Sequence, residues 1–123
     1  MHHPEKWVAI GTVADIPRRG ARCVVTPAGR IAVFRTQDDQ IFAVEDRCPH
    51  KGGPLSQGIV HDASVACPLH GQVISLETGD VRGPDIGHVR TFAVRVDPDT
   101  KAIEMAMPAA VQATNPRLVE AAE

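Results

Sequence analysis

The stretch CPHKGGPLSQGIVHDASVACPLH, residues 48–70, has a short pair of metal-binding side chains at each end. One residue separates Cys48 from His50, two residues separate Cys67 from His70, and sixteen residues lie between the pairs. Thiolate and imidazole groups are strong ligands for iron, zinc and copper, and four of them complete the coordination of a metal site. The spacing therefore predicts two loops that bring four ligands together.

Each pair supplies one sulfur and one nitrogen ligand, which differs from the pattern of a zinc finger. Zinc fingers usually have two cysteines at one place and two histidines at another. In one kind of [2Fe-2S] centre, two histidines replace two cysteines on one of the irons. That arrangement suits two loops that each supply one ligand of each type. We therefore predict that Cys48 and Cys67 bind one iron and that His50 and His70 bind the other.

Two other interpretations of these four residues compete with a [2Fe-2S] centre. A mononuclear zinc site accepts the same ligands and stays an alternative, because short motifs often match by chance. A disulfide between Cys48 and Cys67 would leave both histidines unexplained and would need an oxidising compartment. The chain has three cysteines, and an odd number also argues against a disulfide framework.

Length and composition limit the other possibilities. The chain has 123 residues, which predicts one domain. The net charge of −2 comes from scattered charges, so we expect no nucleic-acid partner. No apolar run is long enough to span a bilayer, and the first residues are not followed by a signal-peptide core, so we expect a cytoplasmic protein with no membrane partner.

Alternating apolar residues predict an all-β fold in which strands on both sides of the ligand region form a base. A polar turn at 37–40 joins two of these strands into a hairpin, and Gly11 and Thr12 are expected to end the first strand. The expected strands are 7–10, 22–26, 30–36, 41–45, 64–66, 72–76, 89–96 and 102–105.

Residues 46–84 contain both ligand pairs and much of the glycine and proline. We predict that they form a cluster-binding lobe inserted between the strands of the base. Glycine-rich turns can present backbone N–H groups to the sulfides of a cluster. Residues 1–108 would make up the domain, and the Ala-rich residues 109–123 a tail. The expected hydrogen-bond donors are Lys51, Gly52, Gly53, Gly71 and Gln72.

Several chemically interesting residues lie outside the ligand pattern. Cys23 stands in a strand-like run and is expected to be a core residue. His61 and His88 have no ligand partner at a motif spacing, so we expect them on the surface. The chain has no Ser/His/Asp pattern, paired carboxylates or phosphate loop, and no catalytic residue is predicted. The chemistry therefore indicates one-electron transfer.

Residues 48–60, 67–70, 73–79 and 89–96 resemble the small subunit of assimilatory NAD(P)H-dependent nitrite reductase, within the Rieske family. The resemblance implies a Rieske-like antiparallel β-sandwich and a [2Fe-2S] cluster. It also implies a large partner subunit that carries sirohaem, a [4Fe-4S] cluster and flavin and reduces nitrite to ammonium. Two alternatives stay open: a Rieske-type ferredoxin of an aromatic-ring dioxygenase, and a zinc-binding interaction module.

The family resemblance also bears on the reduction potential. High-potential members have an extra cysteine in each ligand loop and hydroxyl side chains soon after the second histidine. Here Leu69 stands at the second of these cysteine positions, and Gln72, Val73 and Ile74 offer no hydroxyl. The resemblance therefore implies a potential near the lower end of the range of about −150 to +300 mV.

Overall fold

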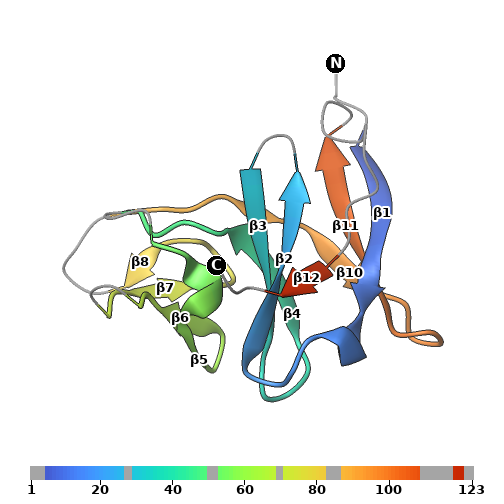
Figure 1. Cartoon of the computed structure of the whole chain (residues 1–123), viewed down its shortest axis with the longest axis horizontal. Helices are drawn as coiled ribbons and strands as arrows, with labels where there is room; N and C mark the ends of the chain where they lie inside the picture. The colour runs from blue at the N-terminus through green and yellow to red at the C-terminus, as the bar shows by residue number, and fades with distance from the viewer. Residues whose placement is uncertain are drawn as a thin grey trace.

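The computed structural model describes residues 5–26, 29–49, 53–68, 71–82, 87–108 and 118–120, and these residues form antiparallel sheets (Figure 1). The expected all-β fold is confirmed. The helical turns in the described ranges are short 3-10 segments, Val13–Asp15 and Leu55–Gln57. No helix in this part of the chain is long and apolar enough to cross a membrane.

A five-stranded sheet in the order β12-β2-β3-β4-β9 lies at the centre of the molecule (Figure 1). Its central strand, β3, has Ala32 and Phe34 on one face and Ile31 and Val33 on the other, and all four are buried. Because both faces of this strand are covered, its sequence is a nearly continuous apolar run. The strands are β12 (Leu118–Glu120), β2 (Gly20–Thr26), β3 (Gly29–Arg35), β4 (Ile41–Glu45) and β9 (Thr91–Phe92).

A second sheet packs on one face of the central sheet. It has the order β1-β11-β10, with β1 at Glu5–Thr12, β11 at Ala102–Pro108 and β10 at Val94–Val96. Ile103 and Met105 of this sheet pack with Val24 and Val33 of the central sheet in one buried cluster. The expected end of the first strand at Gly11 and Thr12 is wrong, because the strand continues past a register shift between Ala9 and Gly11. A β-bulge interrupts a ladder without ending it.

The alternating segment 89–96 is not the single strand that its pattern predicts. Thr91 and Phe92 pair with β4 of the central sheet, whereas Val94–Val96 pairs with β11 of the second sheet. Ala93 lies between the two, and its carbonyl accepts a hydrogen bond from the N–H of Ala106 at 2.9 Å. The segment thus crosses from one sheet to the other, and the alternating pattern gave no sign of the change of partner.

The C-terminal segment contributes a strand where we expected a tail. Leu118–Glu120 pairs with β2, so the expectation is wrong for these three residues. Leu118 is partly buried and packs with the cluster between the central and second sheets. A Cβ atom at Gly11 would lie 2.7 Å from Cδ1 of Leu118. The glycine at the bulge therefore leaves space for this leucine.

We predict that Leu118→Ala lowers the free energy of unfolding by about 1–2 kcal/mol, because it removes a partly buried side chain from this contact. Val119 is the matched control, since it is the next residue and is 45% exposed. We expect Val119→Ala to change stability by less than about 0.5 kcal/mol. Urea unfolding monitored by circular dichroism measures both values. Equal, small effects would show that β12 contributes no packing.

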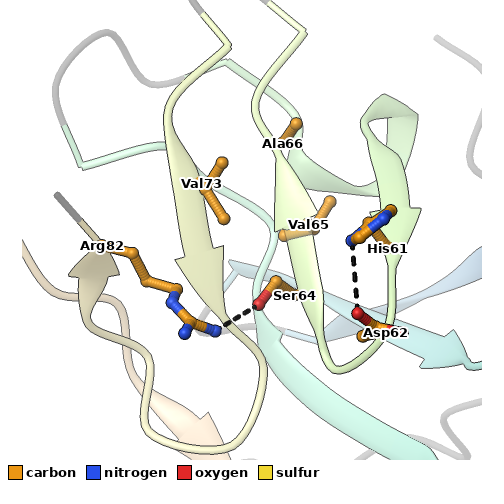
Figure 2. Close-up of a pocket in the computed structure, with 7 residues that line it drawn as sticks. All are labelled: His61, Asp62, Ser64, Val65, Ala66, Val73 and Arg82. Atoms are coloured by element: carbon orange, nitrogen blue, oxygen red, sulfur yellow. Dashed lines mark hydrogen bonds and ion pairs between the residues drawn. The ribbon is translucent and has the colours of Figure 1, made fainter.

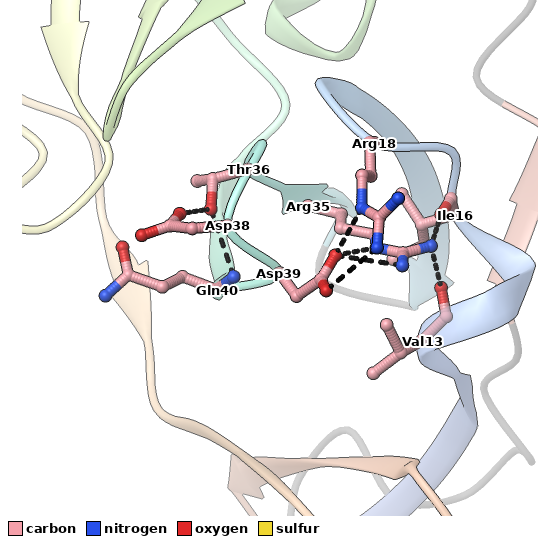
Figure 3. Close-up of polar contacts among 8 residues, drawn as sticks. All are labelled: Val13, Ile16, Arg18, Arg35, Thr36, Asp38, Asp39 and Gln40. Carbon is pink, nitrogen blue, oxygen red and sulfur yellow. Dashed lines mark hydrogen bonds and ion pairs between the residues drawn. The ribbon is translucent and has the colours of Figure 1, made fainter.

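Ion pairs fasten the loop after the first 3-10 turn to the β3–β4 hairpin (Figure 3). Asp39, in the hairpin turn, accepts hydrogen bonds at 2.9 Å from Nε of Arg18 and from Nε of Arg35. Arg35 also donates to the carbonyls of Val13 and Ile16. The bonds from Arg18 and then Arg35 lower the pKa of the Asp39 carboxyl to about 2. Asp39 therefore stays charged at neutral and mildly acidic pH, and its ion pairs with Arg18 and Arg35 are kept over that pH range.

Candidate metal centre

The four-stranded sheet β5-β6-β7-β8 forms a separate lobe against the other face of the central sheet, at the left of Figure 1. The sheet lies within residues 46–84, where the cluster-binding lobe is expected. Leu55, Val60, Val65 and Ile74 of this region pack with Phe34 of β3 in one buried cluster. The lobe strands are β5 (Ile59–His61), β6 (Ser64–Ala66), β7 (Val73–Ser75) and β8 (Val81–Arg82).

Two of the lobe strands were predicted and two were missed. Strand β6 has the expected bounds, and β7 lies within the expected 72–76. Strands β5 and β8 have three and two residues, which is too short for an alternating pattern to stand out. Their identity as strands depends on pairing with β6 and β7.

The first ligand loop begins where β4 leaves the central sheet. Cys48 is 1% exposed, and its N–H donates to the carbonyl of Gly53 at 2.8 Å. Just before the loop, the N–H of Glu45 donates to the carbonyl of Arg90 at 2.9 Å, and the N–H of Arg90 donates to Oε1 of Glu45 at 2.8 Å. These two hydrogen bonds hold the start of the first ligand loop against the segment that contains Arg90.

The second ligand loop connects β6 to β7. Cys67 is 2% exposed, and its N–H donates to the carbonyl of Gln72 at 2.7 Å. The N–H of Gly71 donates back to the carbonyl of Cys67 at 2.9 Å. Gly71 has a φ of 70°, which glycine adopts without the steric cost that a side chain imposes. Two main-chain hydrogen bonds therefore close this loop. The first ligand loop is closed in the same way by the bond from Cys48 to Gly53.

The two loops lie side by side. The Sγ atom of Cys48 is 3.6 Å from Oε1 of Gln72, which belongs to the second loop. Cys48 and Cys67, the predicted ligands, belong to the same buried cluster. All three cysteines are in the described ranges, and none of them forms a disulfide. Two buried thiols at the ends of adjacent closed loops are suited to hold one iron of a cluster.

The predicted histidine ligands, His50 and His70, lie outside the described residues, as do Lys51 and Gly52. Within the described ranges, no group of three or more Cys, His, Asp or Glu side chains is placed to hold a metal ion. The four-ligand set therefore stays a prediction. Of the expected donors, Gln72 contacts Cys48 through its side chain, but as an acceptor: its Oε1 lies 3.6 Å from the Cys48 thiol that donates to it.

The other two histidines of interest lie on the surface, as expected. The side chain of His61 is 78% exposed. The side chain of His88 is 58% exposed, and its Nδ1 lies 2.8 Å from Oδ1 of Asp80. Among the residues that the structure describes, neither belongs to a group of three or more side chains that could hold a metal ion.

Cys23 is fully buried, which confirms that it is a core residue, but its surroundings are more polar than we expected. Its Sγ lies 3.3 Å from Oδ2 of Asp46, and Nη2 of Arg30 lies 3.3 Å from the same sulfur. Burial, and to a lesser degree the charge of Asp46, raises the pKa of the Cys23 thiol. Cys23 is therefore a protonated donor to Asp46, and no local pattern indicates this contact, because 23 residues separate the two.

A shallow hollow of about 570 Å³ lies on the lobe sheet, with His61, Asp62, Ser64 and Arg82 among its lining residues (Figure 2). Arg82 donates to the Ser64 hydroxyl at 3.1 Å, while the His61 ring pairs with Asp62 at 3.5 Å. Ser64 and His61 thus have different partners and do not form a nucleophile–base pair.

Comparisons with known proteins agree with this arrangement. A family model described as Rieske-like [2Fe-2S] domain matches residues 6–105. The anthranilate 1,2-dioxygenase ferredoxin subunit of Burkholderia cepacia is 34% identical over 92 residues, which is 74% of this chain and 84% of that protein. A 3-phenylpropionate/cinnamic acid dioxygenase ferredoxin subunit of Photorhabdus laumondii is 46% identical over 70 residues, covering 55% of this chain and 64% of that subunit.

Other relatives are longer than this chain, and the match spans 11% to 22% of their length. Among solved structures, one described as an NADPH nitrite reductase small subunit is similar, with a TM-score of 0.72 and 27% sequence identity. The similarity covers 81% of this chain and 97% of that one.

Proposed function

The chain belongs to the Rieske-like [2Fe-2S] domain family, and on this premise we propose that it transfers single electrons through a cluster held by Cys48, His50, Cys67 and His70. When bound, the cluster supplies reversible one-electron chemistry. The observation that supports the site is the pair of buried cysteines, 1% and 2% exposed, in two adjacent closed loops. The family match supports a [2Fe-2S] cluster over the zinc alternative.

The residues of the chain hold and shield the site. Burial of Cys48 and Cys67 keeps water from their sulfurs, and the closed loops limit their movement. A rigid ligand set changes little between two oxidation states. His50 and His70 would bind the second iron, and their ring edges would provide the route by which electrons enter and leave.

For the partner, we infer the large subunit of an assimilatory NAD(P)H-dependent nitrite reductase, which carries sirohaem, a [4Fe-4S] cluster and flavin. The resemblance in residues 48–60, 67–70, 73–79 and 89–96 supports this assignment, and so does the similarity to a nitrite reductase small subunit over 97% of its chain. In such an enzyme the substrate site would lie on the large subunit. This chain would be an electron-transfer subunit.

A second candidate is a Rieske-type ferredoxin that serves an aromatic-ring dioxygenase. The 34% identity to the anthranilate 1,2-dioxygenase ferredoxin subunit over 84% of its length supports it. Both candidates have the same cluster and differ in the protein that exchanges electrons with the chain.

Electron transfer to purified partners distinguishes the two candidates. The chain is reduced, mixed with either a nitrite reductase large subunit or a dioxygenase oxygenase component, and reoxidation of its visible absorbance is followed by stopped flow. We expect fast reoxidation by the large subunit in the presence of nitrite, and no nitrite reduction by the chain alone with NADH or NADPH. Fast reoxidation by the oxygenase component alone would favour the ferredoxin assignment.

A further inference from the structure

The carboxylate of Asp46 is buried directly beside the first ligand loop. Its side chain is 1% exposed, although the residue as a whole is partly accessible through its backbone. Burial of a charged group is costly unless charges and hydrogen bonds compensate it. Such a group, two residues before Cys48, therefore needs an explanation.

The side chain of Asp46 bridges the two ends of the first ligand loop. Oδ1 accepts the N–H of Ser56 at 2.7 Å, and Oδ2 accepts the Ser56 hydroxyl at 2.9 Å. Ser56 follows the loop that the bond from Cys48 to Gly53 closes. The hydrogen bonds between Asp46 and Ser56 thus close the same loop a second time, one step outside the bond between Cys48 and Gly53.

The same carboxylate fastens the loop to the central sheet. The Cys23 thiol on β2 donates to Oδ2 at 3.3 Å, and Nε of Arg30 on β3 lies 3.7 Å from Oδ2. The backbone N–H of Asp46 also donates to the carbonyl of Arg30 at 3.1 Å. Arg30 is 39% exposed at its side chain, so solvent weakens its compensation of the Asp46 charge.

We propose that Asp46 is a positioning residue for the cluster: its carboxylate closes the first ligand loop, and its buried charge lowers the reduction potential of the cluster. Two residues span at most about 7 Å of extended chain, so the charge is close to the ligand Cys48. Reduction adds one electron to the cluster, and a nearby fixed negative charge opposes that step in a low-dielectric interior. The inference rests on the proposed ligand set.

Asp46→Asn tests the charge, because asparagine keeps the shape and one acceptor oxygen. We expect a positive shift of the reduction potential and faster loss of iron to a chelator. Asp62→Asn is the matched control, since Asp62 lies in the same lobe with a 90% exposed side chain and a φ of 52°, which asparagine tolerates. The control should leave the potential unchanged, because solvent screens an exposed charge.

Ser56→Ala is expected to shift the reduction potential in the direction opposite to Asp46→Asn. It removes the hydroxyl that donates to Oδ2 and leaves the carboxylate less compensated, so we expect the potential to fall while iron is again lost faster. A purely structural role would speed iron loss in both variants without shifting the potentials in opposite directions. If Asp46→Asn fails to hold a cluster, the sign of the Ser56→Ala shift decides.

Iron and sulfide analysis and electron paramagnetic resonance of the wild-type chain come first. A wild-type chain without iron and sulfide would refute the ligand set itself. Potentials then come from redox titration of each cluster-containing variant. A cluster-containing Asp46→Asn protein with the same potential as Asp62→Asn would overturn the role of Asp46, and so would an unchanged potential in Ser56→Ala.

Discussion

Replacing Cys67 by Ser is expected to abolish the visible absorbance of the protein and to reduce its iron from about two per chain to background. Serine keeps the size of the side chain and the N–H bond to Gln72, but a hydroxyl is a poor substitute for an iron-binding thiolate. Because cluster binding and folding are coupled, the variant should also unfold at a lower urea concentration. Visible spectroscopy, chemical iron and sulfide analysis, and urea unfolding measure the three effects.

The matched control is Cys23→Ser, which makes the same substitution at another buried cysteine. Cys23 lies on β2 of the central sheet, and a serine hydroxyl there can still donate to Asp46. We expect the visible spectrum and the iron content to be retained. Loss of the cluster in Cys23→Ser, or its retention in Cys67→Ser, would show that the predicted ligand set is wrong.

Replacing Phe34 by Ala is expected to lower the free energy of unfolding by about 3–5 kcal/mol. That is a large part of the total of about 5–15 kcal/mol typical of a native protein. Phe34 is fully buried on the face of the central sheet that carries the lobe, where it packs in one cluster with Leu55, Val65 and both ligand cysteines. A cavity there should loosen the lobe and speed iron loss to a chelator. Chemical denaturation and the rate of iron release measure the two consequences.

Phe42 provides the comparison for Phe34. It lies opposite Phe34 in the β3–β4 register and is only partly buried against the same cluster. Phe42→Ala should therefore cost less stability and release iron more slowly than Phe34→Ala. Equal losses for the two variants would contradict the view that Phe34 supports the lobe.

The proposed site followed from local sequence, whereas its surroundings did not. The two residues of each cysteine–histidine pair lie within three positions of each other in the chain, and the structure places Cys48 and Cys67 in adjacent loops. The buried contact of Asp46 with Cys23 and Ser56 was not anticipated. Asp46 is 23 residues from Cys23 and 10 residues from Ser56, so no local pattern indicates these contacts. An aspartate in a loop is also usually exposed.

Local pattern was enough to predict the β3–β4 hairpin, although it missed the short strands β5 and β8, which also pair with their neighbours in sequence. The polar turn at 37–40 and the flanking alternation indicated the β3–β4 hairpin, because a short connection leaves few other ways to pair. The alternating apolar segments likewise predicted an all-β domain, and the ligand pairs with their glycine and proline predicted an inserted lobe. These features depend on residues that are close together in the chain, so a single sequence contains the information.

Only the tertiary structure decided the long-range pairings. Residues 91–92 and 94–96 join different sheets, and Leu118–Glu120 pairs with β2 about a hundred residues earlier in the chain. An alternating segment exposes the same backbone donors and acceptors to any free strand edge. Its partner is therefore chosen by which edge lies within reach and which apolar surface its side chains can cover. That choice of partner depends on the assembled core. The assembled core also determines that the carboxylate of Asp46 is buried beside the first ligand loop.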